Sequence, residues 1–339
     1  ASVARRAVLQ PRARWCAAPA AAPQGSVEMP FPSEPSPAEA SALVPRRRPA
    51  LESWAGPGSA VYANPICAQL DQLLLRCGEL EDVLALTVTH RGVFFVHNLV
   101  TAVQVLGAMA AEQNDPIAVN AMLRDPRYDL LIRDLLRFVP KLDFVAMTNV
   151  ACSLRQLDHK QYFLLSRMLS TLLRQTAPDV ATLLRCAQAY SWAGYHSHTE
   201  IYARFAAYIA ERAPEMSSAE LVEACGLFGR AEHYQAGLFN AVEQALVGQD
   251  LIERELSPQE VGVVAGAFSA HLRTSHDEVM GCVARYLERE AQLMEVPDIA
   301  KCLRAFRRMA LHFEGAVLAG LGAAATPLRR AWLMRRRAE

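Results

Sequence analysis

Residues 256–268 read Leu-Ser-Pro-Gln-Glu-Val-Gly-Val-Val-Ala-Gly-Ala-Phe, and this stretch predicts the beginning of a buried helix. Ser257 is a residue type that caps helices, and Glu260 stands at the spacing of a capping box. Pro258 is tolerated at the first helical position, where its missing N–H costs nothing. Small and aliphatic residues then lead to Phe268. The same layout recurs in the chain, so this stretch indicates a repeat.

Five segments share a turn, a first helix, a short polar break and a second helix. Their first helices begin at Asp143, Asp179, Ser218, Ser257 and Val296, of which the Asp and Ser residues are expected N-caps. Alignment places one residue of each segment at an equivalent core position, with spacings of 36, 38, 40 and 38: Leu154, Tyr190, Phe228, Phe268 and Phe306. The second helices are expected at 162–174, 201–212, 238–247, 278–290 and 313–321, each with one apolar stripe. Residues 97–103 resemble 148–154 and suggest an earlier, divergent copy.

A two-helix unit of this length cannot bury its apolar stripe alone, so neighbouring units must stack. The expected fold is therefore all-α, an α-solenoid of roughly 38-residue helix-turn-helix repeats. We expect a basic, Pro/Ala-rich extension over 1–60 and an N-terminal helical region over 61–140. Five helical hairpins over 141–322 and an Arg-rich tail over 323–339 complete the predicted organisation.

The stretch at 256–268 resembles the octotricopeptide and heptatricopeptide repeats of organellar proteins, which have an "SPQ" turn followed by small residues and an aromatic. Residues 216–222 and 296–300 are weaker copies. The resemblance extends over 143–321 and relates the chain to FAST-kinase-like and RAP proteins. Those proteins usually have a RAP domain after the repeats, and we expect none here because few residues follow residue 321. It implies organellar RNA work: transcript stabilisation, rRNA maturation or membership of a mitochondrial ribosome.

The charge is distributed unevenly along a chain with 35 basic and 35 acidic residues. Residues 1–50 carry a net charge of +4 and residues 301–339 one of +7, which leaves −11 for 51–300. Acidic residues on the expected first helices are Glu220, Glu223, Glu260 and Asp298. Because phosphates repel such an array, the sequence favours a solenoid that docks proteins while its basic ends contact RNA.

The basic termini are the predicted contacts for RNA or an acidic partner. These residues are Arg46, Arg47, Arg48, Arg329, Arg330, Trp332, Arg335, Arg336 and Arg337. A tryptophan among arginines can stack on a base or on a protein. The alternative is that Trp332 packs as a last amphipathic turn while the arginines face water.

No sequence motif for catalysis, phosphate binding or metal binding is present, so we expect no enzyme, cofactor, metal or small-molecule substrate. His196, His198 and Glu200 are clustered but stand in a polar break between helices. His90 and His97 would share a helical face, with no carboxylate expected nearby. The eight cysteines are scattered singly and are expected to pack as small core residues. No run of about 18 apolar residues predicts a membrane span.

The first 27 residues contain four arginines and no acid, which is typical of a mitochondrial or plastid targeting segment. A plain disordered tail is the alternative. Together these features predict a non-catalytic subunit of a large assembly in the mitochondrial matrix, foremost the mitochondrial ribosome. In that assembly the solenoid would contact other subunits and the basic ends would contact rRNA. An autonomous organellar RNA-binding factor and a scaffold subunit of a respiratory or ATP synthase complex remain as alternatives.

Overall fold

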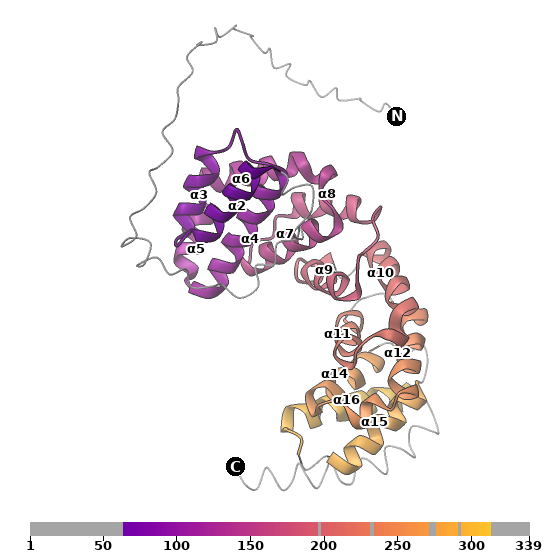
Figure 1. Cartoon of the computed structure of the whole chain (residues 1–339). Coiled ribbons are helices and arrows are strands. Elements are labelled where there is room, and N and C mark those ends of the chain that lie inside the picture. The colour runs from indigo at the N-terminus through magenta and orange to yellow at the C-terminus, as the bar shows by residue number, and fades with distance from the viewer. Residues whose placement is uncertain (1–63, 196–197, 231–233, 271–275, 291–292, 313–339) are drawn as a thin grey trace, which may run out of the picture. The chain divides into compact units, whose positions relative to one another are not determined.

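The computed structural model describes residues 64–195, 198–230, 234–270, 276–290 and 293–312, and within these ranges it contains helices and no strand (Figure 1). The helices pack side by side, which confirms the all-α class. None of the described helices is both long and apolar enough to cross a membrane.

The described α-helices, in chain order, are α2 (Pro65–Arg76), α3 (Leu80–Thr89), α4 (Val96–Gln113), α5 (Pro116–Leu123), α6 (Pro126–Phe138), α7 (Phe144–Gln156), α8 (Tyr162–Leu172), α9 (Val180–Trp192), α10 (Thr199–Arg212), α11 (Ser218–Phe228), α12 (Ala236–Gly248), α13 (Leu251–Arg254), α14 (Pro258–Phe268), α15 (Asp277–Glu290) and α16 (Val296–His312).

The beginnings of the first helices follow from their caps. The Asp143 carboxylate accepts from the Ala146 amide at 2.7 Å, at the beginning of α7. Asp179 accepts from the Thr182 amide at 2.6 Å in the same way at α9. Such a bond satisfies an amide that has no partner within the helix.

The predicted cap at Ser218 is wrong by one residue. Ser217 caps α11, and its capping box with Glu220 is complete: the Ser217 amide donates to Glu220 Oε2 at 2.9 Å. Only Ser217 stands three residues before a glutamate, which is the spacing that this reciprocal arrangement requires. Ser257 and Glu260 form the same box at α14, as expected, with the Ser257 amide 2.8 Å from Glu260 Oε2.

The first helices contact one another in chain order. α4 packs against α7, α7 against α9, α9 against α11, α11 against α14, and α14 against α16. Among the second helices, α10 packs against α12 and α12 against α15, whereas α8 contacts α6 and α7. α5 and α6 lie in the chain between α4 and α7, and α6 packs against α3 and α4.

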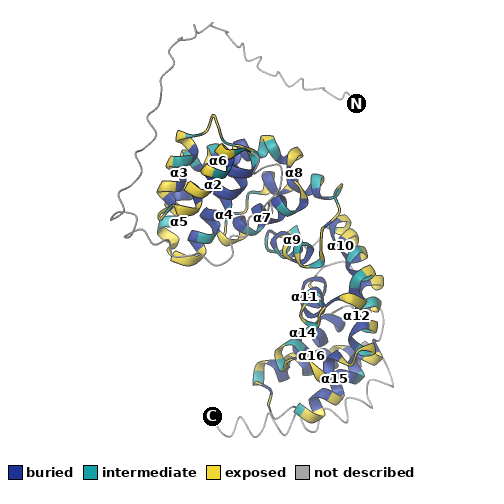
Figure 2. Ribbon diagram, viewed as in Figure 1, coloured by how far each residue is buried: buried dark blue, intermediate teal, exposed yellow. Residues whose placement is uncertain are grey.

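The buried side chains of these helices form one hydrophobic core (Figure 2). The five residues aligned at the equivalent position are all buried, each with an exposed fraction of 2% or less: Leu154, Tyr190, Phe228, Phe268 and Phe306. Phe268 meets Phe239 of α12 edge to face, with ring centroids 5.3 Å apart. α8, α10, α12 and α15 agree with the expected second helices, and the one expected at 313–321 lies outside the described residues.

The N-terminal helices contain a buried polar cluster that the sequence did not reveal. His90 is the C-cap of α3 and His97 lies in α4, so the two histidines do not share a helix. The prediction that no carboxylate lies near His97 is wrong, because Asp71 of α2 places Oδ2 2.5 Å from His97 Nε2. Asn98 donates to the other carboxylate oxygen at 2.7 Å and to the Cys67 carbonyl at 2.9 Å. This cluster joins α2 to α4 through their interior.

The described cysteines are small members of the packed interior. Cys67, Cys186, Cys225, Cys282 and Cys302 are buried. Burial raises the pKa of the Cys186 and Cys225 thiols to about 12, which keeps them protonated and poorly reactive.

Candidate nucleic-acid interface

Two hollows lie next to each other on the first helices. The first, which we call the arginine hollow, is lined by α11, α14 and α16 and has a volume of about 530 Å³. Its cationic residues are Arg230, Lys301, Arg304 and Arg308. The three on α16 follow one another at intervals of three and four, which places them on one face of the helix. The sequence expectation of an acidic first-helix face therefore does not describe this hollow.

The floor of the arginine hollow is made of small residues. Gly262 and Gly266 of α14 and Gly226 of α11 line it. A Cβ added at Gly266 would meet no atom within 4 Å, so this position is open to the hollow. Gly229 has a packing role instead, because a Cβ there would come within 2.7 Å of the Ala267 Cα. Glycine thus lets α11 approach α14 at Gly229 and leaves space in the hollow at Gly266.

The second hollow, which we call the tryptophan hollow, is lined by α7, α9, α11 and Val263 of α14 and has a volume of about 540 Å³. It presents an indole, two guanidinium groups, an amide and a carboxyl group. These belong to Trp192, Arg155, Arg230, Gln188 and Glu223. Arg230, Gly226 and Val263 line both hollows, so the two are continuous at α11.

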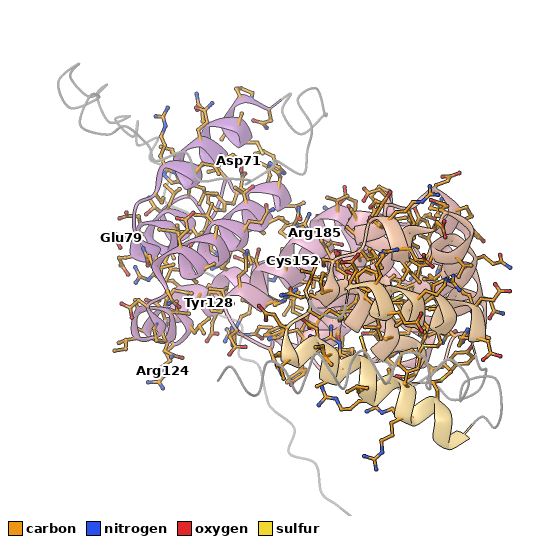
Figure 3. All side chains as sticks on the ribbon, turned by 90° about the horizontal axis from the view of Figure 1, so that it is seen from below. Asp71, Glu79, Arg124, Tyr128, Cys152 and Arg185 are labelled. Carbon is orange, nitrogen blue, oxygen red and sulfur yellow. The ribbon has the colours of Figure 1, made fainter. Side chains whose placement is uncertain are left out.

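A network of polar bonds crosses the first helices at the tryptophan hollow. Arg155 Nη1 donates to Gln188 Oε1 at 2.8 Å, and Gln188 Nε2 donates to Glu223. Burial raises the pKa of the Glu223 carboxyl group, and the bond from Gln188 acts in the opposite direction. Beside this network, Arg185 of α9 lies near Cys152 of α7, as Figure 3 shows, and it donates to Asn149 at 3.1 Å.

Three of the four acidic residues expected on the first helices are held in local interactions, whereas the fourth, Glu223, lines the tryptophan hollow. Glu220 and Glu260 complete the capping boxes of α11 and α14, at the helix N-termini where negative charge is favourable. Asp298 is buried, with 3% exposed, and its carboxylate lies 2.8 Å from Lys301 Nζ. These carboxylates neutralise helix ends or one lysine, so they add little negative potential to the hollows.

The arginines of the hollows lack carboxylate partners among the described residues. Arg230 donates to the Gly226 carbonyl at 2.7 Å, and Arg155 bonds to the neutral Gln188 amide. Arg304 and Arg308 are exposed and form no ion pair within the described ranges. Guanidinium groups without anionic partners beside an accessible hollow can bind phosphate or carboxylate ligands.

The predicted contact residues of the termini are not part of this description. Arg46, Arg47, Arg48, Arg329, Arg330, Trp332, Arg335, Arg336 and Arg337 all lie outside the described residues. His196 also lies outside them, and within the described ranges no group of three or more potential ligands could hold a metal ion.

The sequence contained a signal for the hollows that the total charge concealed. Lys301, Arg304 and Arg308 share a helical face, and glycines recur in α11 and α14 near the aligned aromatic positions. A face-by-face count of charge would have separated these cations from the capping glutamates. The chain matches no family model, and a search of curated proteins finds no relative.

Proposed function

We propose that this chain is a non-catalytic α-solenoid subunit of a large mitochondrial ribonucleoprotein, foremost the mitochondrial ribosome, and that its first-helix hollows contact RNA. The observation that carries the RNA contact is the row of arginines without carboxylate partners beside the glycine floor of the arginine hollow. Exposed arginines beside a hollow are suited to phosphates, which bind arginine with paired hydrogen bonds.

The solenoid part of the proposal is supported by the order of helix contacts. Each first helix packs against the first helix of the next hairpin, and α10, α12 and α15 follow one another in a second series. Repeat architectures bury their stripes in this neighbour-to-neighbour manner. The mitochondrial matrix location is supported by the arginine-rich, acid-free sequence of residues 1–27, and the non-catalytic role by the lack of a catalytic motif in the sequence.

A sucrose gradient of organelle lysate tests membership of an assembly. We expect the protein to migrate with the ribosome in Mg²⁺. When EDTA separates the large and small ribosomal subunits, the protein should migrate with one of them. Migration in a light, RNase-sensitive particle would instead support the second candidate, an autonomous RNA-binding factor, which the same arginines favour. Appearance only in a detergent-extracted membrane complex would contradict both.

Charge reversal on α16 tests the RNA contact directly. Arg304→Glu and Arg308→Glu should each weaken binding of the full chain to a single-stranded RNA. Each should also reduce the magnitude of the negative slope of log Kobs against log salt by at least about 0.7, the value for one lost phosphate contact on a single strand, because the new carboxylate also repels the strand. The measurement is a fluorescence anisotropy titration at several salt concentrations.

Arg307→Glu is the matched control, because Arg307 is exposed on the same helix but does not line the arginine hollow. It changes the net charge by the same amount and should leave the slope nearly unchanged. Equal effects of all three substitutions would mean that RNA senses only the overall charge, and the proposed site in the hollow would be wrong.

A further inference from the structure

We propose that the tryptophan hollow receives an unstacked base of single-stranded RNA, with Trp192 as the stacking surface and with the strand's phosphates in the adjoining arginine hollow. This inference rests on the proposed RNA contact and specifies its ligand. The supporting observation is that the two hollows share Arg230 but differ in their other side chains. The arginine hollow presents cations, whereas the tryptophan hollow presents an aromatic ring with polar groups.

Trp192 is held in place by a hydrogen bond at its indole nitrogen and by a cation over one face of its ring. Its indole Nε1 donates to Asp158 Oδ1 at 3.2 Å, and Asp158 has the left-handed backbone φ of 48°. Lys160 Nζ lies over one face of the indole, 5.5 Å from the ring centroid. A partly buried indole held in this way loses little conformational freedom when a ligand stacks on it. Base stacking on an aromatic ring tolerates every base, because each base has a π face.

The polar groups of the tryptophan hollow can bond to the edge of a base. Gln188 and Glu223 supply an amide and a carboxyl group, and Arg155 supplies a guanidinium group, all joined in one network. Amide, carboxyl and guanidinium groups are the side chains that pair with base edges. By contrast, the described lining of the arginine hollow has no aromatic ring and no carboxylate, so it suits phosphates rather than bases.

The arrangement selects single strands over duplexes. Sequence-readable bases in RNA are exposed mainly where they are unstacked, in loops, bulges and ends. In a duplex the base faces are covered by neighbouring pairs, so a duplex can offer phosphates to Arg304 and Arg308 but no free base to Trp192. The arginine hollow would then bind both forms, and the tryptophan hollow only the single strand.

The test compares Trp192→Ala with Trp192→Phe in the full chain, titrated with single-stranded poly(U) and with duplex RNA. Trp192→Ala should weaken poly(U) binding about 5- to 150-fold, the range expected for one lost base stack. Trp192→Phe should retain most of the affinity, and duplex binding should change little in either variant. Phe163→Ala is the matched control, because Phe163 is 73% exposed on α8 and lines neither hollow.

A second measurement leaves Trp192 itself unchanged. With Trp15, Trp54 and Trp332 replaced by Phe, Trp192 is the remaining tryptophan, and its fluorescence should be quenched by poly(U) but not by duplex RNA. Absence of quenching while Arg304→Glu still weakens binding would overturn the base site and leave the phosphate contact standing. If poly(U) quenches no fluorescence and Arg304→Glu also leaves RNA binding unchanged, the RNA contact itself would be contradicted. Equal quenching by an acidic peptide would assign the hollow to a protein partner instead and would also overturn the base site.

Discussion

Phe268→Ala is expected to lower the free energy of unfolding by about 3–5 kcal/mol, the cost of removing a fully buried aromatic side chain. Phe268 has no exposed surface, and its ring packs edge to face against Phe239 and against His276, whose ring centroid lies 4.8 Å away. The truncation leaves a cavity that rigid neighbouring helices cannot fill. Urea denaturation followed by circular dichroism measures the loss.

The same variant distinguishes a solenoid from a globular bundle. In a repeat array each unit contacts only its neighbours, so a defect in α14 should loosen α11, α12, α15 and α16 first. Hydrogen exchange should then increase strongly in those helices and little in α2, α3 and α4. Phe163→Ala, at an exposed site, should change the unfolding free energy by no more than about 0.5 kcal/mol. A uniform increase of exchange along the chain would contradict the solenoid.

Asp71→Ala is expected to destabilise the N-terminal helices by about 3 kcal/mol, because it removes the partner of two buried polar side chains. His97 and Asn98 are almost completely buried, and both bond to the Asp71 carboxylate. Without it their polar atoms lose a partner in a place that water reaches poorly. Thermal and urea unfolding of the full chain measure the effect.

Asp134→Ala is the matched comparison. Asp134 of α6 also forms an ion pair, with Arg91 of the turn after α3 at 2.7 Å, but the Arg91 side chain is 44% exposed. Water can replace the lost contact there, so we expect a cost of about 1 kcal/mol or less. A double-mutant cycle of Asp71 with His97 then isolates their coupling. Equal losses for the two aspartate variants would mean that burial of the Asp71 cluster adds nothing to stability.

Much of the helical architecture was predictable because its signals are local. Asp143, Asp179 and Ser257 act as caps through bonds to amides only a few residues away, so their sequence context is sufficient. The apolar stripes of α10 and α15 follow the helical period in the same way. The error at Ser218 arose because two serines are adjacent, and the distance to Glu220 decides between them.

The candidate site was less predictable because it combines residues from helices far apart in the chain. Arg155, Gln188 and Glu223 belong to three first helices, and their bonds exist only where α7, α9 and α11 pack together. The four acidic residues on the first helices suggested repulsion of phosphate. Glu220 and Glu260 are nevertheless held in caps and Asp298 is paired with Lys301, none of which the net charge reveals.

The sequence by itself determined the all-α class, the positions of most helices from α7 to α16 and the burial of the five aligned core residues, since caps and apolar periodicity act over a few residues. Tertiary structure alone decided that Asp71 bonds to His97, that Gly266 faces open space while Gly229 faces Ala267, and that Trp192 and Arg230 line one hollow. The physical reason is that a contact between helices depends on which faces pack together, and packing is set by the whole core rather than by any one segment.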